Sequence, residues 1–207
     1  MKKIIIAIDS FKGCLTSAEA GKAAEKGIKS INPSCHTSVI PIADGGEGLL
    51  DVLITATKGK YITLSAHGPL MKMAKTHYGL SGNGRTAIIE MAAISGLPLV
   101  PIEQRNPMLT TTFGTGELIK DALNKGCRNF IIGIGGSATN DAGLGMLQAL
   151  GFRFLDKSGH TLGTGGQIME AVANIDTSGI HPALRETHFM VACDCLLYTS
   201  PSPRDCS

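Results

Sequence analysis

Tryptophan is absent from this 207-residue sequence, and aromatic residues make up only 4% of it. Proteins that bind single-stranded nucleic acids commonly stack bases on aromatic side chains, and that means of binding is missing here. The chain also has no run of lysines and arginines, and its formal net charge is only +2. Without a basic patch there is little electrostatic attraction for a phosphate backbone. We therefore expect no nucleic-acid partner.

Long apolar segments and metal-binding spacings are missing as well. No apolar run reaches the roughly 18 residues of a membrane-spanning helix, and the N-terminal run IIIAI meets Asp9 too soon for a signal peptide. The six cysteines form no CxxC pair, and the six histidines show no ligand spacing. We expect a cytoplasmic protein with reduced thiols, no membrane partner and no zinc site.

Glycine is abundant, with 26 residues, and hydrophobic residues make up 43% of the chain, as in α/β proteins with many strand-to-helix turns. The apolar run at 130–134 predicts a buried parallel strand. The glycine-rich segment 135–141 follows it, and then Leu144, Leu147 and Leu150 recur at helical spacing. A strand, a glycine-rich turn and a helix in this order can bind an anion. We predict that the phosphates of a nucleotide bind here.

Two sequence templates and one structural alternative remain open for this loop. Gly133-x-Gly135-x-x-Ala138 fits the looser dinucleotide fingerprint, and Asp156 lies near the offset of a ribose-binding acid. The GxxxxGK[ST] loop is excluded, because no lysine lies between residues 127 and 157. A tight turn that uses glycine for packing alone is the third interpretation.

Polar clusters also follow two further predicted strands, and open α/β sheets place ligands at such strand ends. The strand at 3–8 ends in Asp9, Ser10 and Lys12, which could meet a metal, a substrate hydroxyl or an anion. The strand at 37–42, with an edge position because of Pro41, leads into the segment DGGEG at 44–48. Two acids around two glycines favour a magnesium, sugar-alcohol or general-base site over a plain turn.

Short strands at 61–64, 76–80 and 86–91 predict an antiparallel meander, which we interpret as a second, smaller α/β element. Glu90 is either an outward-facing residue or a buried functional carboxylate. Thr115 is either a helix cap or part of a second anion site.

Several segments together resemble the bacterial glycerate kinase family, type I: AIDSFKG, ADGGEG, IIEMA followed by SGL, TTFGTGELI and GIGGSATNDAG. The resemblance covers residues 1–194. It implies a Rossmann-like parallel sheet domain with a second, smaller mixed α/β domain. It also implies that ATP, with Mg²⁺, phosphorylates D-glycerate to 2-phosphoglycerate or 3-phosphoglycerate.

The resemblance implies a division of the chain as well. Residues 1–60 would begin the Rossmann-like domain, 61–107 would form the small element, and 108–194 would return to the nucleotide site. Members of the family are longer than this chain. We therefore expect an incomplete version of the enzyme, which can be inactive, and we interpret residues 195–207 as a non-native tail.

The site hypothesis assigns residues to four tasks. Asp44, Lys12 and Glu47 would be catalytic, with Asp44 orienting or deprotonating the attacking hydroxyl. Asp141 and Asp194 would hold Mg²⁺. The residues that would bind glycerate are Asp9, Ser10, Lys12, Gly45 and Gly46. The residues that would bind ATP are Gly135, Gly136, Ser137, Thr139, Asn140 and Thr115.

Two other functions remain as alternatives. An NAD-linked oxidoreductase would use the dinucleotide fingerprint, but uncompensated acids at the loop and at neighbouring strand ends disfavour a pyrophosphate without a cation. A non-catalytic module that binds a small anion would need no turnover at all.

Overall fold

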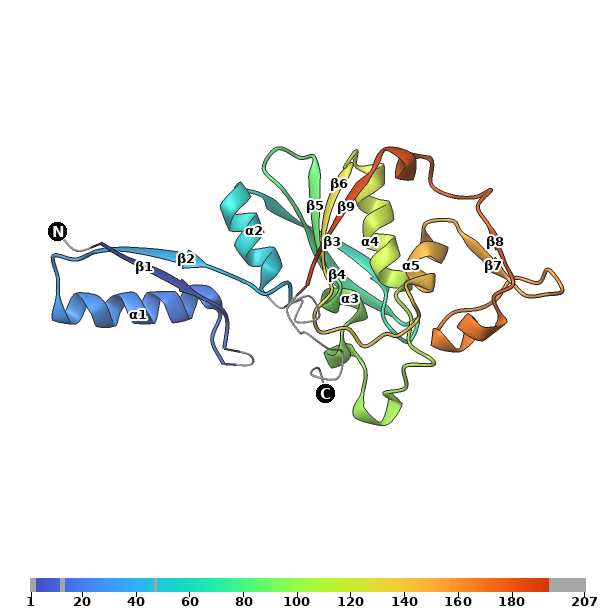
Figure 1. Ribbon diagram of the computed structural model, residues 1–207, viewed down its shortest axis with the longest axis horizontal. Helices are drawn as coiled ribbons and strands as arrows, with labels where there is room; N and C mark the ends of the chain where they lie inside the picture. The colour runs from blue at the N-terminus through green and yellow to red at the C-terminus, as the bar shows by residue number, and fades with distance from the viewer. Residues whose placement is uncertain (1–2, 12–13, 47, 194–207) are drawn as a thin grey trace, which may run out of the picture.

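The computed structural model describes residues 3–11, 14–46 and 48–193. Its strands form three sheets: one central sheet of five strands and two smaller sheets of two strands each. Figure 1 shows the N-terminal unit projecting from one side of the central sheet, while strands β7 and β8 lie beyond the opposite side.

The central sheet combines antiparallel and parallel strands. In sheet order the strands are β3 (Lys60–His67), β4 (Met73–Leu80), β5 (Thr86–Glu90), β6 (Asn129–Gly133) and β9 (His188–Ala192). The first three pair antiparallel, and β5, β6 and β9 run parallel. The predicted strand at 130–134 is confirmed as β6, between two parallel neighbours.

Side chains that alternate along β5 join two hydrophobic clusters. Ala87 and Ile89 belong to the main core with Leu118 and Ile119 of helix α4 (Phe113–Asn124). Ile88 belongs to the smaller cluster that includes Leu50 and Ile54 of helix α2 (Leu49–Thr57). Since neighbouring side chains of a strand point to opposite faces, α4 and α2 cover opposite faces of this strand.

The predicted meander is present, but its strands do not form a separate sheet. β5 pairs antiparallel with β4 on one side and parallel with β6 on the other, so the sheet runs across the expected boundary at residue 107. The division of the protein into domains stays a prediction.

The N-terminal unit consists of β1 (Lys3–Ile8), helix α1 (Ser17–Ile31) and β2 (His36–Pro41), with the two strands parallel. Thr16 and Glu19 form the capping box that begins α1. The expectation that β1 is a buried strand is wrong for one of its faces: Ile6 is 8% exposed and Ile5 is 60% exposed. Within the described residues, β1 and β2 form a sheet of two strands that α1 contacts.

Shorter elements connect these layers. They are α3 (Ala92–Ser95), η1 (Leu97–Leu99), η2 (Ile102–Gln104), α5 (Leu144–Ala149), β7 (Arg153–Leu155), η3 (Gly166–Ala171), β8 (Asn174–Asp176) and η4 (Pro182–Glu186). The predicted helix after the glycine-rich segment is confirmed as α5.

Ile89→Ala is expected to lower the free energy of unfolding by about 2–5 kcal/mol, because it leaves a cavity in a core position that is 0% exposed. Ile5→Ala is the matched control, with an expected loss below about 1 kcal/mol. Urea denaturation measures both changes. Equal losses of unfolding free energy in the two variants would contradict the exposure of Ile5 on β1.

Candidate active site

The segments that follow β2 and β6 meet the end of β9 at one edge of the central sheet. The amide of Gly135, after β6, donates a hydrogen bond of 3.4 Å to the carbonyl of Gly45, after β2. The amide of Ile134 donates a bond of 3.2 Å to the carbonyl of Ala192, at the end of β9. Three segments that are far apart in the sequence therefore share one rim.

Glycine is required for this contact. A Cβ atom on Gly133 would lie 2.6 Å from the carbonyl oxygen of Gly45, and one on Gly135 would lie 2.6 Å from the Cα of Gly46. Gly45 also has a φ of +89°, a conformation that favours glycine. The structure thus brings three predicted site residues, Gly45, Gly46 and Gly135, into direct contact.

Asp44 lies beside this contact and shapes its own loop. Its Oδ1 accepts a hydrogen bond of 2.9 Å from the amide of Gly46. A Cβ on Gly46 would be 3.0 Å from that oxygen and 3.9 Å from the Cα of Gly135. The carboxylate is partly buried and close to the glycine-rich loop.

The glycine-rich loop does not lead directly into helix α5. Its carbonyl at Gly136 accepts a bond of 3.0 Å from the amide of Leu97, and the amide of Ala138 donates one of 2.9 Å to the carbonyl of Ser95. These bonds hold the loop against the segment that links α3 to η1. The helix begins only at Leu144, so the predicted strand, tight turn and helix are present in order but are not contiguous.

The buried carboxylate of Asp141 accepts hydrogen bonds from the amides at the N-terminus of α5. Its carboxylate is 1% exposed and accepts bonds from the amides of Gly143 and Gly145 at 3.1 Å each. It also accepts the amide of Thr112 at 2.8 Å and the hydroxyls of Thr111 and Thr112. The predicted phosphate position at this helix N-terminus is not formed, because an internal carboxylate takes it.

The same contacts do not fit the predicted role of Asp141 as a magnesium ligand. A carboxylate offers about four lone-pair sites, and five donors already surround this one. In the part of the chain that the structure describes, no group of three or more His, Cys, Asp or Glu side chains could hold a metal ion.

Three other predicted residues lie away from the rim contact. Thr115 is inside α4, 1% exposed, and its hydroxyl lies 2.9 Å from that of Ser95. Asn140 is exposed. Asp156 follows β7, where its Oδ1 accepts the amides of Ser158 at 2.8 Å and His160 at 2.9 Å. Asp156 therefore shapes a turn, which removes the geometric support for a ribose contact.

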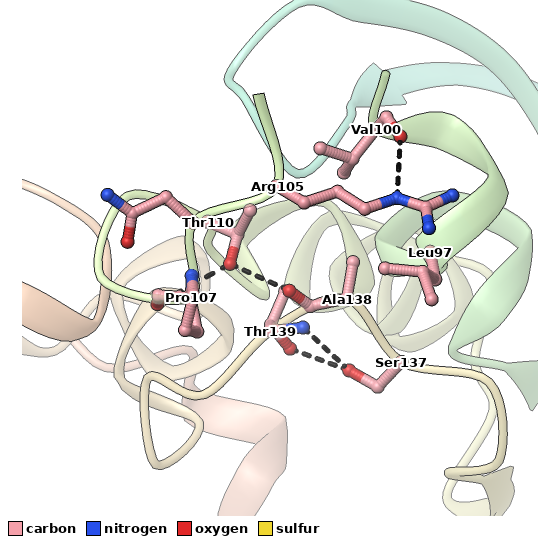
Figure 2. A pocket seen from close by; sticks show the side chains of 9 residues that line it. Leu97, Val100, Arg105, Pro107, Thr110, Ser137, Ala138 and Thr139 are labelled. Carbon is pink, nitrogen blue, oxygen red and sulfur yellow. Dashed lines mark hydrogen bonds between the residues drawn. The ribbon is translucent and has the colours of Figure 1, made fainter. Parts of the chain in front are cut away.

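A first cavity, of about 260 Å³, lies between the glycine-rich loop and the connector after η2. Figure 2 shows Ser137 and Thr139 along its lower side, Arg105 along its upper side, and Thr110 between them. The Thr110 hydroxyl donates a bond of 2.8 Å to the carbonyl of Ala138, which ties the connector to the loop.

A second cavity, of about 470 Å³, lies between the N-terminal unit and α2. Ser10 lines it together with Asp51, His77 and Glu90. Ser10 and Ser137 therefore face different cavities. Asp9 turns toward its own neighbour, since its Oδ1 accepts the amide of Ser10 at 2.6 Å.

Glu90 ends β5 and supports the start of α2. Its Oε1 accepts the amide of Leu50 at 2.8 Å. Burial raises the pKa of this carboxyl and is the largest influence on it; the amides of Leu50 and Gly48 lower the pKa, Asp51 raises it, and His77 lowers it. Glu90 is therefore partly buried and not outward-facing, and a functional role for its carboxylate stays a prediction.

Three predicted residues, Lys12, Glu47 and Asp194, lie outside the described residues. Sequence reasoning missed Arg105 and Thr110 as cavity residues, because they lie in a proline-marked connector with no periodic pattern. None of the helices in the described ranges has the length and apolar character needed to cross a membrane.

Asp141→Asn is expected to lower the free energy of unfolding by about 2–3 kcal/mol, because an amide NH₂ would face N–H and O–H donors. Asp156→Asn is the matched control: asparagine can shape the same exposed turn, so we expect a change within about 0.5 kcal/mol. Chemical denaturation of both variants measures the difference. A small loss for Asp141→Asn would contradict its bracing role.

Glu90→Gln should change how stability depends on pH. A folded pKa above the usual 4.5 means that the folded state holds the proton more tightly than the unfolded chain. The protonated Glu90 carboxyl therefore contributes fully to the free energy of unfolding below pH 4.5. This contribution is lost as pH rises through the folded pKa. The free energy of unfolding of Glu90→Gln minus that of the unsubstituted chain should rise from about pH 4.5 upward and then level off.

Glu19→Gln provides a control of opposite sign. Hydrogen bonds from Thr16 lower the pKa of Glu19, so its stabilisation is present above pH 4.5 and is lost as pH falls through the folded pKa. The corresponding free-energy difference should fall with rising pH. Urea titrations at several pH values test both, and a flat difference for Glu90→Gln would contradict the raised pKa.

Known proteins are similar to this chain over nearly its whole length. The family model described as "Glycerate kinase family" matches residues 4–197. A glycerate kinase of Bacillus subtilis (strain 168) is 53% identical over 192 residues, which is 93% of this chain and 50% of the relative. A glycerate 2-kinase of Escherichia coli (strain K12) is 49% identical, with the same coverage of both chains.

A solved structure shows the same fold. The crystal structure that carries the name glycerate kinase 2, from Salmonella typhimurium LT2, superposes with a TM-score of 0.83 at 48% identity. The superposition covers 93% of this chain and 52% of the solved structure. This chain therefore spans about half the length of the relatives that it matches. On this agreement of sequence and fold, the chain belongs to the glycerate kinase family.

Proposed function

We propose that the whole protein containing this chain is a cytoplasmic enzyme that phosphorylates D-glycerate with ATP, giving 2-phosphoglycerate or 3-phosphoglycerate. Mg²⁺ would enter as the complex with ATP. The observation that carries this proposal is the contact between the Asp44 loop and the glycine-rich loop, which sets a carboxylate beside a candidate phosphate site. Family membership supports the same assignment.

The roles follow from what phosphoryl transfer needs, which is mainly positioning and charge stabilisation. Asp44 would accept the proton of the attacking hydroxyl, because its carboxylate lies beside the glycine-rich loop that is proposed to bind the phosphates. The amides of Gly136 and Ser137 and the hydroxyls of Ser137 and Thr139 would bind phosphate oxygens. The amides of Gly135, Ala138 and Thr139 are left out, because each already donates a hydrogen bond within the protein. Ser10, with Lys12, would bind the carboxylate or the transferred phosphoryl group.

This proposal changes the site hypothesis at the magnesium position. Asp141 is left out, because its carboxylate is fully hydrogen-bonded inside the protein. Asp194 and Glu47 stay as proposed contacts of the Mg²⁺ complex and the attacking hydroxyl, respectively. Thr115 is left out because it is buried against Ser95.

Asp44→Asn is expected to lower kcat by about 100-fold or more, the usual contribution of a general base, with KM for ATP nearly unchanged. The measurement is ADP release coupled to a dehydrogenase, with D-glycerate and Mg–ATP, on the protein at the full length of its relatives. Asp156→Asn serves as the control and should keep the unsubstituted rate.

Three outcomes would contradict the proposal. An unchanged rate in Asp44→Asn would remove this residue from catalysis. Tight binding of NAD in the absence of Mg²⁺, without release of ADP from ATP, would favour the oxidoreductase alternative. Glycerate binding with no ATP turnover would instead favour an anion-binding module.

A further inference from the structure

The first cavity carries one cation and no acid. Among the nine residues that line it, Arg105 is the only charged side chain. Within the described residues, no carboxylate forms an ion pair with Arg105, and its one hydrogen bond runs from Nε to the carbonyl of Val100 at 3.3 Å. That bond fixes the base of the guanidinium group and leaves both terminal nitrogens available as donors.

Hydroxyl groups of the glycine-rich loop line the same cavity as the arginine (Figure 2). The hydroxyl oxygens of Ser137 and Thr139 lie 2.8 Å apart, and the Ser137 oxygen also accepts the amide of Thr139 at 3.0 Å. One of the two hydroxyl protons is used within the pair, so the other remains free to donate. The Thr110 hydroxyl is not available in the same way, because it already donates to the carbonyl of Ala138.

We propose that Arg105 and the Ser137–Thr139 hydroxyl pair form an oxyanion site that binds a terminal phosphate or a carboxylate of a small substrate. An arginine fork matches two oxygens of either group, and charge-assisted hydrogen bonds of this kind are among the strong ones. The cavity volume of about 260 Å³ is smaller than a typical pocket for a drug-sized ligand, which fits a phosphate group or a small organic acid.

The proposal deepens the proposed function by naming the cation that holds one of its substrates. The anion can come from the nucleotide, through its phosphates, or from the organic acid, through its carboxylate. Both sources share the chemistry of a compact group with negatively charged oxygens. Binding measurements separate them, and they do not require turnover.

The test compares variants of the full-length protein by isothermal titration calorimetry with four probes: ATP, inorganic phosphate, D-glycerate and the neutral analogue glycerol. Arg105→Gln removes the charge and keeps much of the length, and it should weaken one class of anion by about 10–100-fold. Arg105→Lys keeps the charge without the fork and should give a smaller loss. Arg185→Gln, on exposed η4, is the matched control and should change nothing.

The pattern of losses identifies the anion. Weaker ATP and phosphate binding with unchanged D-glycerate binding assigns the phosphates, and the reverse pattern assigns the carboxylate. A double-mutant cycle with Ser137→Ala should show losses that are not additive, because both side chains would bind one anion. Binding of every anion within twofold of the unsubstituted protein in Arg105→Gln would overturn the site.

The same variants separate this inference from the proposed function. If Arg105→Gln loses anion affinity but the unsubstituted protein never releases ADP with D-glycerate, the site stands and the kinase assignment fails. If the unsubstituted protein is active and Arg105→Gln keeps both KM values, the kinase assignment stands and the site fails.

Discussion

Backbone contact without intervening side chains is the constraint on which this structure depends. Gly45 and Gly46 lie against Gly133 and Gly135 so closely that a methyl group at several of these positions would meet backbone atoms below 3 Å. Because the chain comes together there, the carboxylate of Asp44 lies beside the glycine-rich loop. A side chain in that contact would move the two loops apart, and with them the groups proposed to bind and activate the substrates.

Asp141 shows how a charged residue can serve the framework of a site rather than its chemistry. Its carboxylate joins the start of α4, through Thr111 and Thr112, to the start of α5, through Gly143 and Gly145. Buried carboxylates are tolerated when donors satisfy every oxygen, as they do here. The loop between β6 and α5 is therefore anchored at both ends, which leaves Ser137 and Thr139 in a fixed position on the cavity wall.

Part of the exposed apolar surface lies on strands that have few neighbours in the described part of the chain. Ile5 and Ile40 are exposed on β1 and β2, and Met190 and Val191 are exposed on β9. These strands pair in parallel, an arrangement that usually occurs with both faces covered. The chain spans about half the length of the relatives that it matches.

The sequence by itself predicted most of the strands, the order of elements around the glycine-rich loop, and the family, because hydrophobic periodicity and local motifs are properties of neighbouring residues. It predicted a site role for Gly45, Gly46, Gly135, Ser137 and Asp44, and the structure brings Gly45, Gly46 and Gly135 into contact beside Asp44. Only the tertiary structure decided that Asp141 faces inward, that Ser10 and Ser137 line different cavities, and that Arg105 lines one cavity with Ser137 and Thr139. Burial and cavity lining depend on segments brought together from distant parts of the chain, and no local pattern records those contacts.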